Sequence, residues 1–145
     1  MERKVIIPKQ IYKELLILSR KNIERAGILT YIKQERFGKI ICYVKAIGLI
    51  DEPKKATATE SHISLNKLET YYIWVKKKPD KRGVILFHTH PLGTLRNSIA
   101  DKSFYYNQIK IYAEFIGLTV IKKSRGTIII VTSEDKLNYS DFKIV

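Results

Sequence analysis

The chain has 145 residues, 45% of them hydrophobic, so its size and composition match one globular domain with a buried core and exclude wholesale disorder. Lys and Arg total 27 against 14 Asp and Glu, a net charge of +13, which favours an acidic partner: nucleic acid, an anionic membrane surface or an acidic protein. The single cysteine, Cys42, excludes an internal disulfide framework and a multi-cysteine metal site. The apolar runs are too short to span a bilayer, and the basic N-terminus lacks the apolar core of a signal peptide, so we expect a cytoplasmic protein.

Helix-like and strand-like patterns alternate along the chain and predict a single α/β domain over residues 1–145. In chain order the predicted elements are a helix over 8–22, strands over 24–33 and 39–50, a helix over 65–78, a short strand over 84–88, a helix over 98–116, a hairpin of strands over 118–123 and 127–132, and a final strand over 137–145. Pro8 suits the first position of its helix, and Gly117 is expected to end the third helix. The strand over 39–50 is almost continuously apolar, so we expect both of its faces to be buried. Polar segments over 51–61 and 89–97 are predicted to be loops.

The sharpest local signal is a pair of histidines, His88 and His90, at the predicted end of a buried strand. Residues i and i+2 of a strand point to the same face, so the two imidazoles can lie side by side. Asp101 falls in the first turn of the next predicted helix, three residues after Ser98, its expected N-cap. If the strand end and the helix start converge, the Asp101 carboxylate can complete a set of two histidines and one aspartate. Three such ligands with an open fourth position are typical of catalytic zinc.

Each half of this pattern alone also has a simpler explanation. A lone His-x-His is common in proteins that bind nothing, and Ser98 with Asp101 alone is a variant of the helix capping box. Spacing by itself therefore leaves both interpretations open.

Taken together, the residues closely resemble the motif of the JAMM (JAB/MPN+, Mov34-type) metalloproteases. His88-Thr89-His90-Pro91, six further residues, Ser98, two residues and Asp101 match that motif without insertion or deletion. Upstream, Glu24-Arg25-Ala26-Gly27 matches the Glu-x-x-Gly segment of the family, although Tyr31 stands where many members have a second glycine. The resemblance covers nearly the whole chain and is greatest to compact prokaryotic members. It implies a JAB/MPN-like (cytidine-deaminase-like) domain, with a central mixed β-sheet packed by three helices.

The resemblance also implies an activity and a role for each residue. One Zn²⁺ per chain would be held by His88, His90 and Asp101, with the pKa of its bound water lowered toward about 7. Glu24 would be the general base, and the Ser98 hydroxyl would donate a hydrogen bond to the developing oxyanion. The implied reaction is hydrolysis of an amide or isopeptide bond after the C-terminus of a ubiquitin-like protein, whose conjugate is the expected partner.

Two other functions remain open at this stage. The first is a binding module like the RadC-type domains, whose basic runs (Lys76–Lys78 and Lys81-Arg82, with Lys122-Lys123) would contact nucleic acid. We expect those runs to be ordinary solvated surface, nucleic acid to be the weaker candidate, and no membrane partner. The second is a metallohydrolase that uses the same zinc machinery on a small peptide-like substrate. Cys42 is expected to be a buried apolar residue, and one face of the aromatic run over 71–74 is expected to be core.

Overall fold

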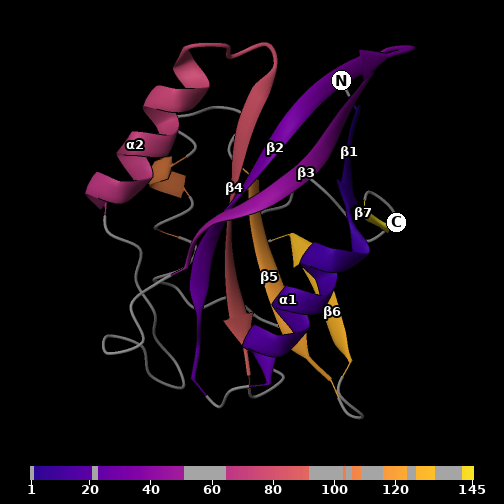
Figure 1. Cartoon of the computed structure of the whole chain (residues 1–145), viewed down its shortest axis with the longest axis vertical. Coiled ribbons are helices and arrows are strands. Elements are labelled where there is room, and N and C mark those ends of the chain that lie inside the picture. The colour runs from indigo at the N-terminus through magenta and orange to yellow at the C-terminus, as the bar shows by residue number, and fades with distance from the viewer. Residues whose placement is uncertain are drawn as a thin grey trace.

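The computed structural model describes residues 2–20, 23–50, 65–91, 103, 106–108, 116–123, 127–132 and 142–145. Its elements are β1 (Glu2–Ile7), α1 (Lys9–Ser19), β2 (Ala26–Arg36), β3 (Lys39–Ile50), α2 (Leu65–Lys76), β4 (Arg82–His90), β5 (Ile116–Lys122), β6 (Ile128–Thr132) and β7 (Phe142–Ile144) (Figure 1). The predicted loop over 51–61, Ser98 and Asp101 lie outside the described residues.

The described strands form one mixed sheet in the order β6-β5-β4-β2-β3-β1-β7. β1 runs parallel to both β3 and β7, and β4 runs parallel to β5. The pairs β2–β3, β2–β4 and β5–β6 are antiparallel. The predicted α/β class with a mixed central sheet is therefore confirmed, and β4 lies near the middle of the sheet.

Helices α1 and α2 cover opposite faces of this sheet (Figure 1). Ile85 and Phe87 of β4 pack in the cluster that contains Leu15 of α1, whereas Leu86 packs in the cluster that contains Leu68 of α2. Neighbouring residues of a strand point to opposite faces, so the apolar run of β4 supplies both layers. Every residue from 83 to 90 is buried.

Both described helices bury the predicted apolar positions. Ile11 and Leu15 of α1, four residues apart, are buried, as are Leu68 and Tyr72 of α2. The aromatic run of α2 thus turns one face into the core, as expected. Pro8 is the N-cap of α1, in extended conformation (φ −61°, ψ 146°), and not its first helical residue, because the helix begins at residue 9.

The first strand is absent from the sequence-based prediction. Val5 and Ile7 of β1 are fully buried and Ile6 between them is half-buried, which is the period-2 burial of a strand. The basic residues Arg3 and Lys4 make the segment look polar, so the sequence does not predict a strand here. The strand forms through long-range pairing with β3.

The predicted burial of β3 on both faces is wrong. Cys42 and Val44 are buried in the cluster with α1, but Lys45, Ala46 and Gly48 are exposed. Ile40 and Ile47 are partly buried against the α1 cluster and Leu49 against the α2 cluster, so only the middle of the strand is fully covered. Cys42 packs as a buried apolar residue, as expected.

The boundaries near β4 and β5 also differ from the prediction. β4 continues to His90, so Thr89 and His90 belong to the strand and not to a loop. Gly117 lies inside β5, so the third predicted helix ends before Ile116; residues 103 and 106–108 are helical. The β5–β6 hairpin is confirmed, and the final strand is described at Phe142–Ile144. None of the helices in the described part of the chain is long and apolar enough to cross a membrane.

Candidate metal centre

His88 and His90 lie side by side at the end of β4. Their Nε2 atoms are 2.9 Å apart, and their ring centroids are 4.7 Å apart at an interplanar angle of 64°. Both side chains are buried, with exposed fractions of 5% and 6%. Strand alternation explains the shared face, and burial fixes the rings with their nitrogens directed at one another.

Glu24 is brought to the same place by the pairing of β2 with β4. The antiparallel register pairs Ala26 with His88, and the same register continued by two residues places Glu24 opposite His90. Glu24 is buried, with an exposed fraction of 8%. A carboxylate that is excluded from water in this way requires polar neighbours. Two chain segments more than 60 residues apart thus converge at one end of the sheet.

Backbone and side-chain hydrogen bonds hold the two segments together beyond the end of the regular ladder. The Thr89 N–H donates to the Arg25 carbonyl oxygen (2.7 Å), and the Arg25 N–H donates to the Thr89 hydroxyl oxygen (2.8 Å). Thr89 is fully buried. Sequence reasoning missed this residue as a site element because it assigned Thr89 to a loop. The available signal was a hydroxyl-bearing, β-branched residue between two histidines.

Gly27 allows β2 to lie close to β4. A Cβ atom at this position would come within 2.4 Å of the Phe87 ring and 2.5 Å of the Leu49 carbonyl oxygen. Gly27 pairs directly with Phe87, so any side chain would push the strands apart near Glu24. Tyr31, the departure from the family pattern, packs in the cluster with α1, on the face opposite to the histidine pair.

The histidine pair fits a zinc ion. Two nitrogens bound to one tetrahedral zinc at about 2.0–2.1 Å would lie about 3.3 Å apart, within a few tenths of an ångström of the observed 2.9 Å. Among the described residues, no group of three or more His, Cys, Asp or Glu side chains is close enough to hold a metal. The described residues therefore supply two candidate ligands. The expected third ligand, Asp101, and the expected oxyanion donor, Ser98, lie outside them.

The chain beyond Asp101 returns to the side of the sheet where the histidines lie. The Tyr72 hydroxyl of α2 donates to Oε1 of Gln108, at 2.6 Å, and the Gln108 side chain is 3% exposed. Leu86 packs with α2 on the same face, and strand alternation gives His88 and His90 that face as well. Gln108, seven residues after Asp101 in the sequence, is thus anchored on the side of the sheet that carries the histidine pair.

Comparison with known proteins shows a similarity in fold. No protein-family model and no curated protein matches the sequence. The solution structure of protein DSY2949 from Desulfitobacterium hafniense is similar to this chain, with a TM-score of 0.63 and 13% sequence identity. The similarity covers 97% of this chain and 92% of that protein, and at such low identity it shows a shared fold alone.

Proposed function

We propose that the protein is a zinc-dependent peptidase of the JAMM type that hydrolyses the amide or isopeptide bond after the C-terminus of a ubiquitin-like protein. The observation that carries this proposal is the convergence of Glu24, His88 and His90 at one end of the β2–β4 pair. The order of these residues along the chain and their spacing agree with the motif that the sequence resembles.

The local environment supports hydrolytic chemistry at this point. The histidine nitrogens face each other, and all three side chains are buried, which lowers the effective dielectric constant and strengthens electrostatic interactions. Zinc bound there would supply Lewis acidity and lower the pKa of a coordinated water to about 7. His88 and His90 would hold it through Nε2, with Asp101 as the proposed third ligand.

Glu24 is the proposed proton carrier. Its carboxylate would accept a proton from the attacking water and return it to the leaving amine, a role that typically contributes about 10²–10⁴ in rate. The hydrogen bonds between Arg25 and Thr89 tie the chain neighbour of Glu24 to the strand that carries the histidines, which would help to orient the proposed base. Ser98 is the proposed donor to the oxyanion.

A cleavage assay with metal control tests the proposal directly. The full chain is incubated with a ubiquitin-like protein fused at its C-terminus to a reporter, with and without a chelator, and its zinc content is measured. We expect one zinc per chain, chelator-sensitive cleavage that zinc restores, and loss of both zinc and cleavage in His88→Ala and His90→Ala. Cleavage that persists in the chelator or in either variant would contradict the proposal.

The substrate class needs a second comparison, because the zinc machinery would be the same for a protein and for a small peptide. Rates are measured for the folded fusion and for a short peptide of the same C-terminal sequence. A higher kcat/KM for the folded fusion supports a protein substrate, and the reverse order identifies a small-substrate metallohydrolase.

A further inference from the structure

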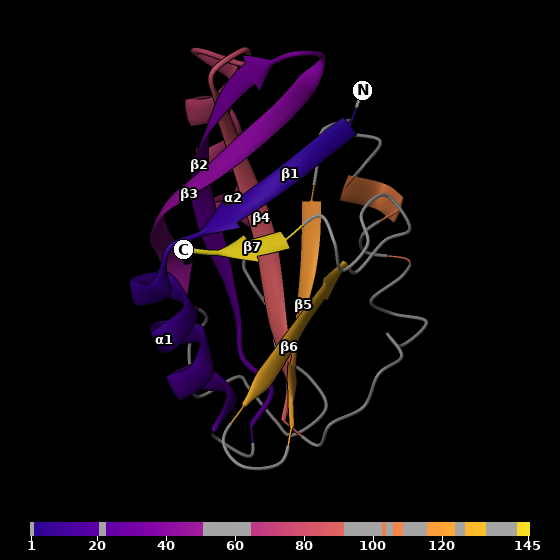
Figure 2. The same ribbon diagram turned by 90° about the vertical axis from the view of Figure 1, so that its right-hand side faces the viewer.

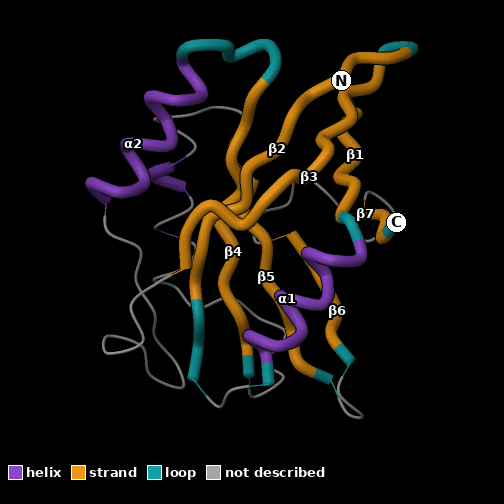
Figure 3. Tube along the Cα trace, in the orientation of Figure 1, coloured by secondary structure: helices purple, strands orange, loops and turns teal. Residues whose placement is uncertain are grey.

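Two turns form one end of the molecule, far from the histidine pair. One is the tip of the β2–β3 hairpin (residues 33–39), and the other is the turn between α2 and β4 (residues 76–82), and we call them together the basic end. The backbone N–H of Lys33 donates to the Lys81 carbonyl oxygen at 2.8 Å, which ties the two turns together. In views that differ by 90°, both turns reach the same end of the long axis (Figures 1, 2 and 3).

The basic end carries a large share of the protein's charge. Its two segments contain eight basic residues and two acidic ones, a net +6 out of +13. The residues are Lys33, Arg36, Lys39, Lys76, Lys77, Lys78, Lys81 and Arg82, with Glu35 and Asp80. Six of the eight basic side chains are exposed, while Lys33 and Arg82 are half-buried. Such a concentration attracts a polyanionic surface.

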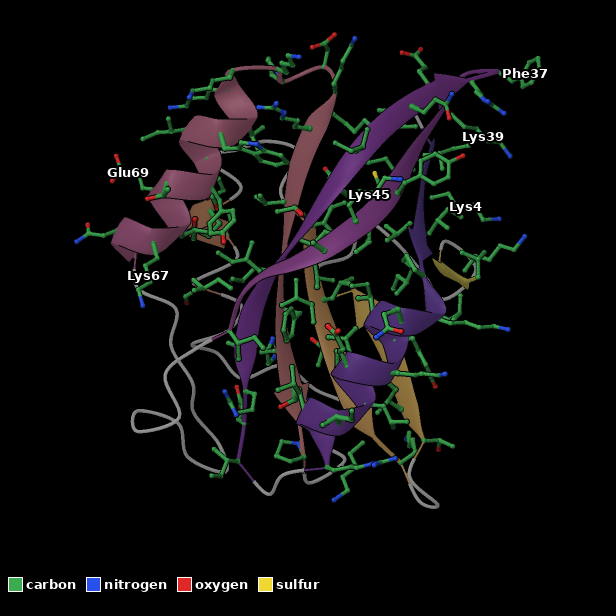
Figure 4. The ribbon with its side chains drawn as sticks, in the orientation of Figure 1. Lys4, Phe37, Lys39, Lys45, Lys67 and Glu69 are labelled. Carbon is green, nitrogen blue, oxygen red and sulfur yellow. The ribbon has the colours of Figure 1, made fainter. Side chains whose placement is uncertain are left out.

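Phe37 stands at the tip of the hairpin with its ring entirely in solvent (Figure 4). Its backbone is in the left-handed region (φ 51°), which costs a residue other than glycine or asparagine about 1–2 kcal/mol, and Gly38 follows at φ 76°. Asn-Gly is the pair that such a two-residue turn prefers. Both the exposure of the ring and the left-handed backbone make a large apolar residue unfavourable at this position. Its presence there points to a role in binding.

We propose that the basic end docks on the surface of an anionic phospholipid bilayer, with Phe37 inserted among the headgroups and the lysines against their phosphates. Two turns that end at the same height can contact a flat surface together. One exposed apolar residue beside Arg36 and Lys39, with the lysines of the second turn at the same end of the molecule, matches the division of a membrane interface into an apolar layer and a charged layer. This proposal replaces the expectation of no membrane partner, and it does not depend on the proposed catalytic activity.

A nucleic acid is the less favoured occupant of this surface. Proteins that bind single strands offer several aromatic rings on which bases stack. Phe37 is the single aromatic residue of the basic end, and the neighbouring Trp74 has the Arg82 guanidinium 4.7 Å from its ring centroid, which covers one face. β4 runs from Arg82 at this end to His90, about 26 Å at 3.3 Å per residue, so docking would leave the histidine pair accessible.

Sedimentation of the full chain with vesicles tests the proposal. One set of vesicles contains phosphatidylcholine alone, and the other contains equal amounts of phosphatidylcholine and phosphatidylserine. We expect binding to the anionic vesicles that high salt reverses, and little binding to the neutral ones. Phe37→Asn suits the turn and should keep the fold, yet weaken binding about tenfold by removing the inserted ring. Lys77→Gln with Lys78→Gln should weaken binding about thirtyfold.

A matched pair of substitutions controls for total charge. Lys9→Gln with Lys13→Gln removes the same charge from exposed positions of α1 and should change binding less than twofold. The proposal is overturned if anionic vesicles do not bind, if Phe37→Asn binds like the natural chain, or if the control pair weakens binding as much as the Lys77 and Lys78 pair. It is also overturned if a single-stranded DNA oligonucleotide binds more tightly than the vesicles and the same two variants weaken that binding.

Discussion

Thr89 and Arg25 are joined twice across the ends of β4 and β2, through the Thr89 N–H to the Arg25 carbonyl (2.7 Å) and the Arg25 N–H to the Thr89 hydroxyl (2.8 Å). Each of these residues is the chain neighbour of a proposed site residue, since Arg25 follows Glu24 and Thr89 lies between His88 and His90. The bonds therefore act where the proposed base must meet the proposed metal ligands.

Substitution of Thr89 tests this link. Thr89→Val keeps the shape but leaves the buried Arg25 N–H without its acceptor, so we expect unfolding free energy to fall by about 1–3 kcal/mol. Urea unfolding measures this loss, and Thr89→Ser, which keeps the hydroxyl, should recover most of it. Equal stability of the valine variant and the natural chain would show that the bond contributes nothing. In the cleavage assay we expect the valine variant to have a lower kcat and a nearly unchanged KM, because the proposed base is displaced and the binding surface is not.

Glu24→Gln tests the proposed base. The amide cannot accept the proton, so we expect kcat to fall by about 10²–10⁴ while zinc content stays at the natural level. Glu35→Gln, at an exposed position of β2, the strand that follows Glu24, is the matched control and should leave the rate unchanged. A Glu24→Gln variant with full activity would assign the proton transfer to another group.

Added zinc should stabilise the folded chain. A ligand at about 100 times its dissociation constant contributes about 2.7 kcal/mol, which for a domain of this size raises Tm by roughly 8 °C. The chelated chain serves as the reference, and thermal unfolding is followed as zinc is added. His88→Ala with His90→Ala should abolish the shift. An equal shift in that double variant would place the zinc elsewhere.

Gly27→Ala should destabilise the domain. The added methyl would meet the Phe87 ring and the Leu49 carbonyl oxygen at 2.4–2.5 Å, and Phe87 is fully buried. We expect a loss of about 1–3 kcal/mol in urea unfolding, typical of an overpacked core. Gly38→Ala is a useful contrast, because nothing lies within 4 Å of that position and any cost there comes from its positive φ alone. An unchanged unfolding midpoint for Gly27→Ala would mean that the strands separate without cost.

Phe37→Asn should make the protein more stable. Asparagine tolerates the left-handed backbone better than phenylalanine, and the exposed ring makes no packing contribution that would be lost, so we expect a gain of about 0.5–1 kcal/mol. Phe37→Ala keeps the unfavourable φ and should change stability little. A destabilised asparagine variant would show that the Phe37 ring supports the hairpin. Stabilisation combined with lost vesicle binding would be the pattern of a residue retained for binding.

Several features of this protein could be read from local sequence because they depend on local geometry. The helical spacing of Ile11 and Leu15 predicted helix α1. The alternation of side chains along a strand was enough to predict that His88 and His90 lie on the same face. The length of β4 was underestimated because Thr89 and His90 are polar, and polar residues at the end of a strand favour the prediction of a loop. The roles of Ser98 and Asp101 remain predictions from the motif.

Other features were decided only by tertiary structure, because they depend on contacts between distant parts of the chain. The pairing of β2 with β4 brings Glu24 to the end of the sheet that carries the histidines, and without the motif its sequence context is that of an ordinary surface carboxylate. β1 is a strand because its backbone pairs with those of β3 and β7. The net charge of +13 is a property of composition, but its concentration at the end that carries Phe37 follows from two turns that strand pairing and packing bring together. Sequence determines which groups are present and their local period, while long-range pairing determines which of them meet.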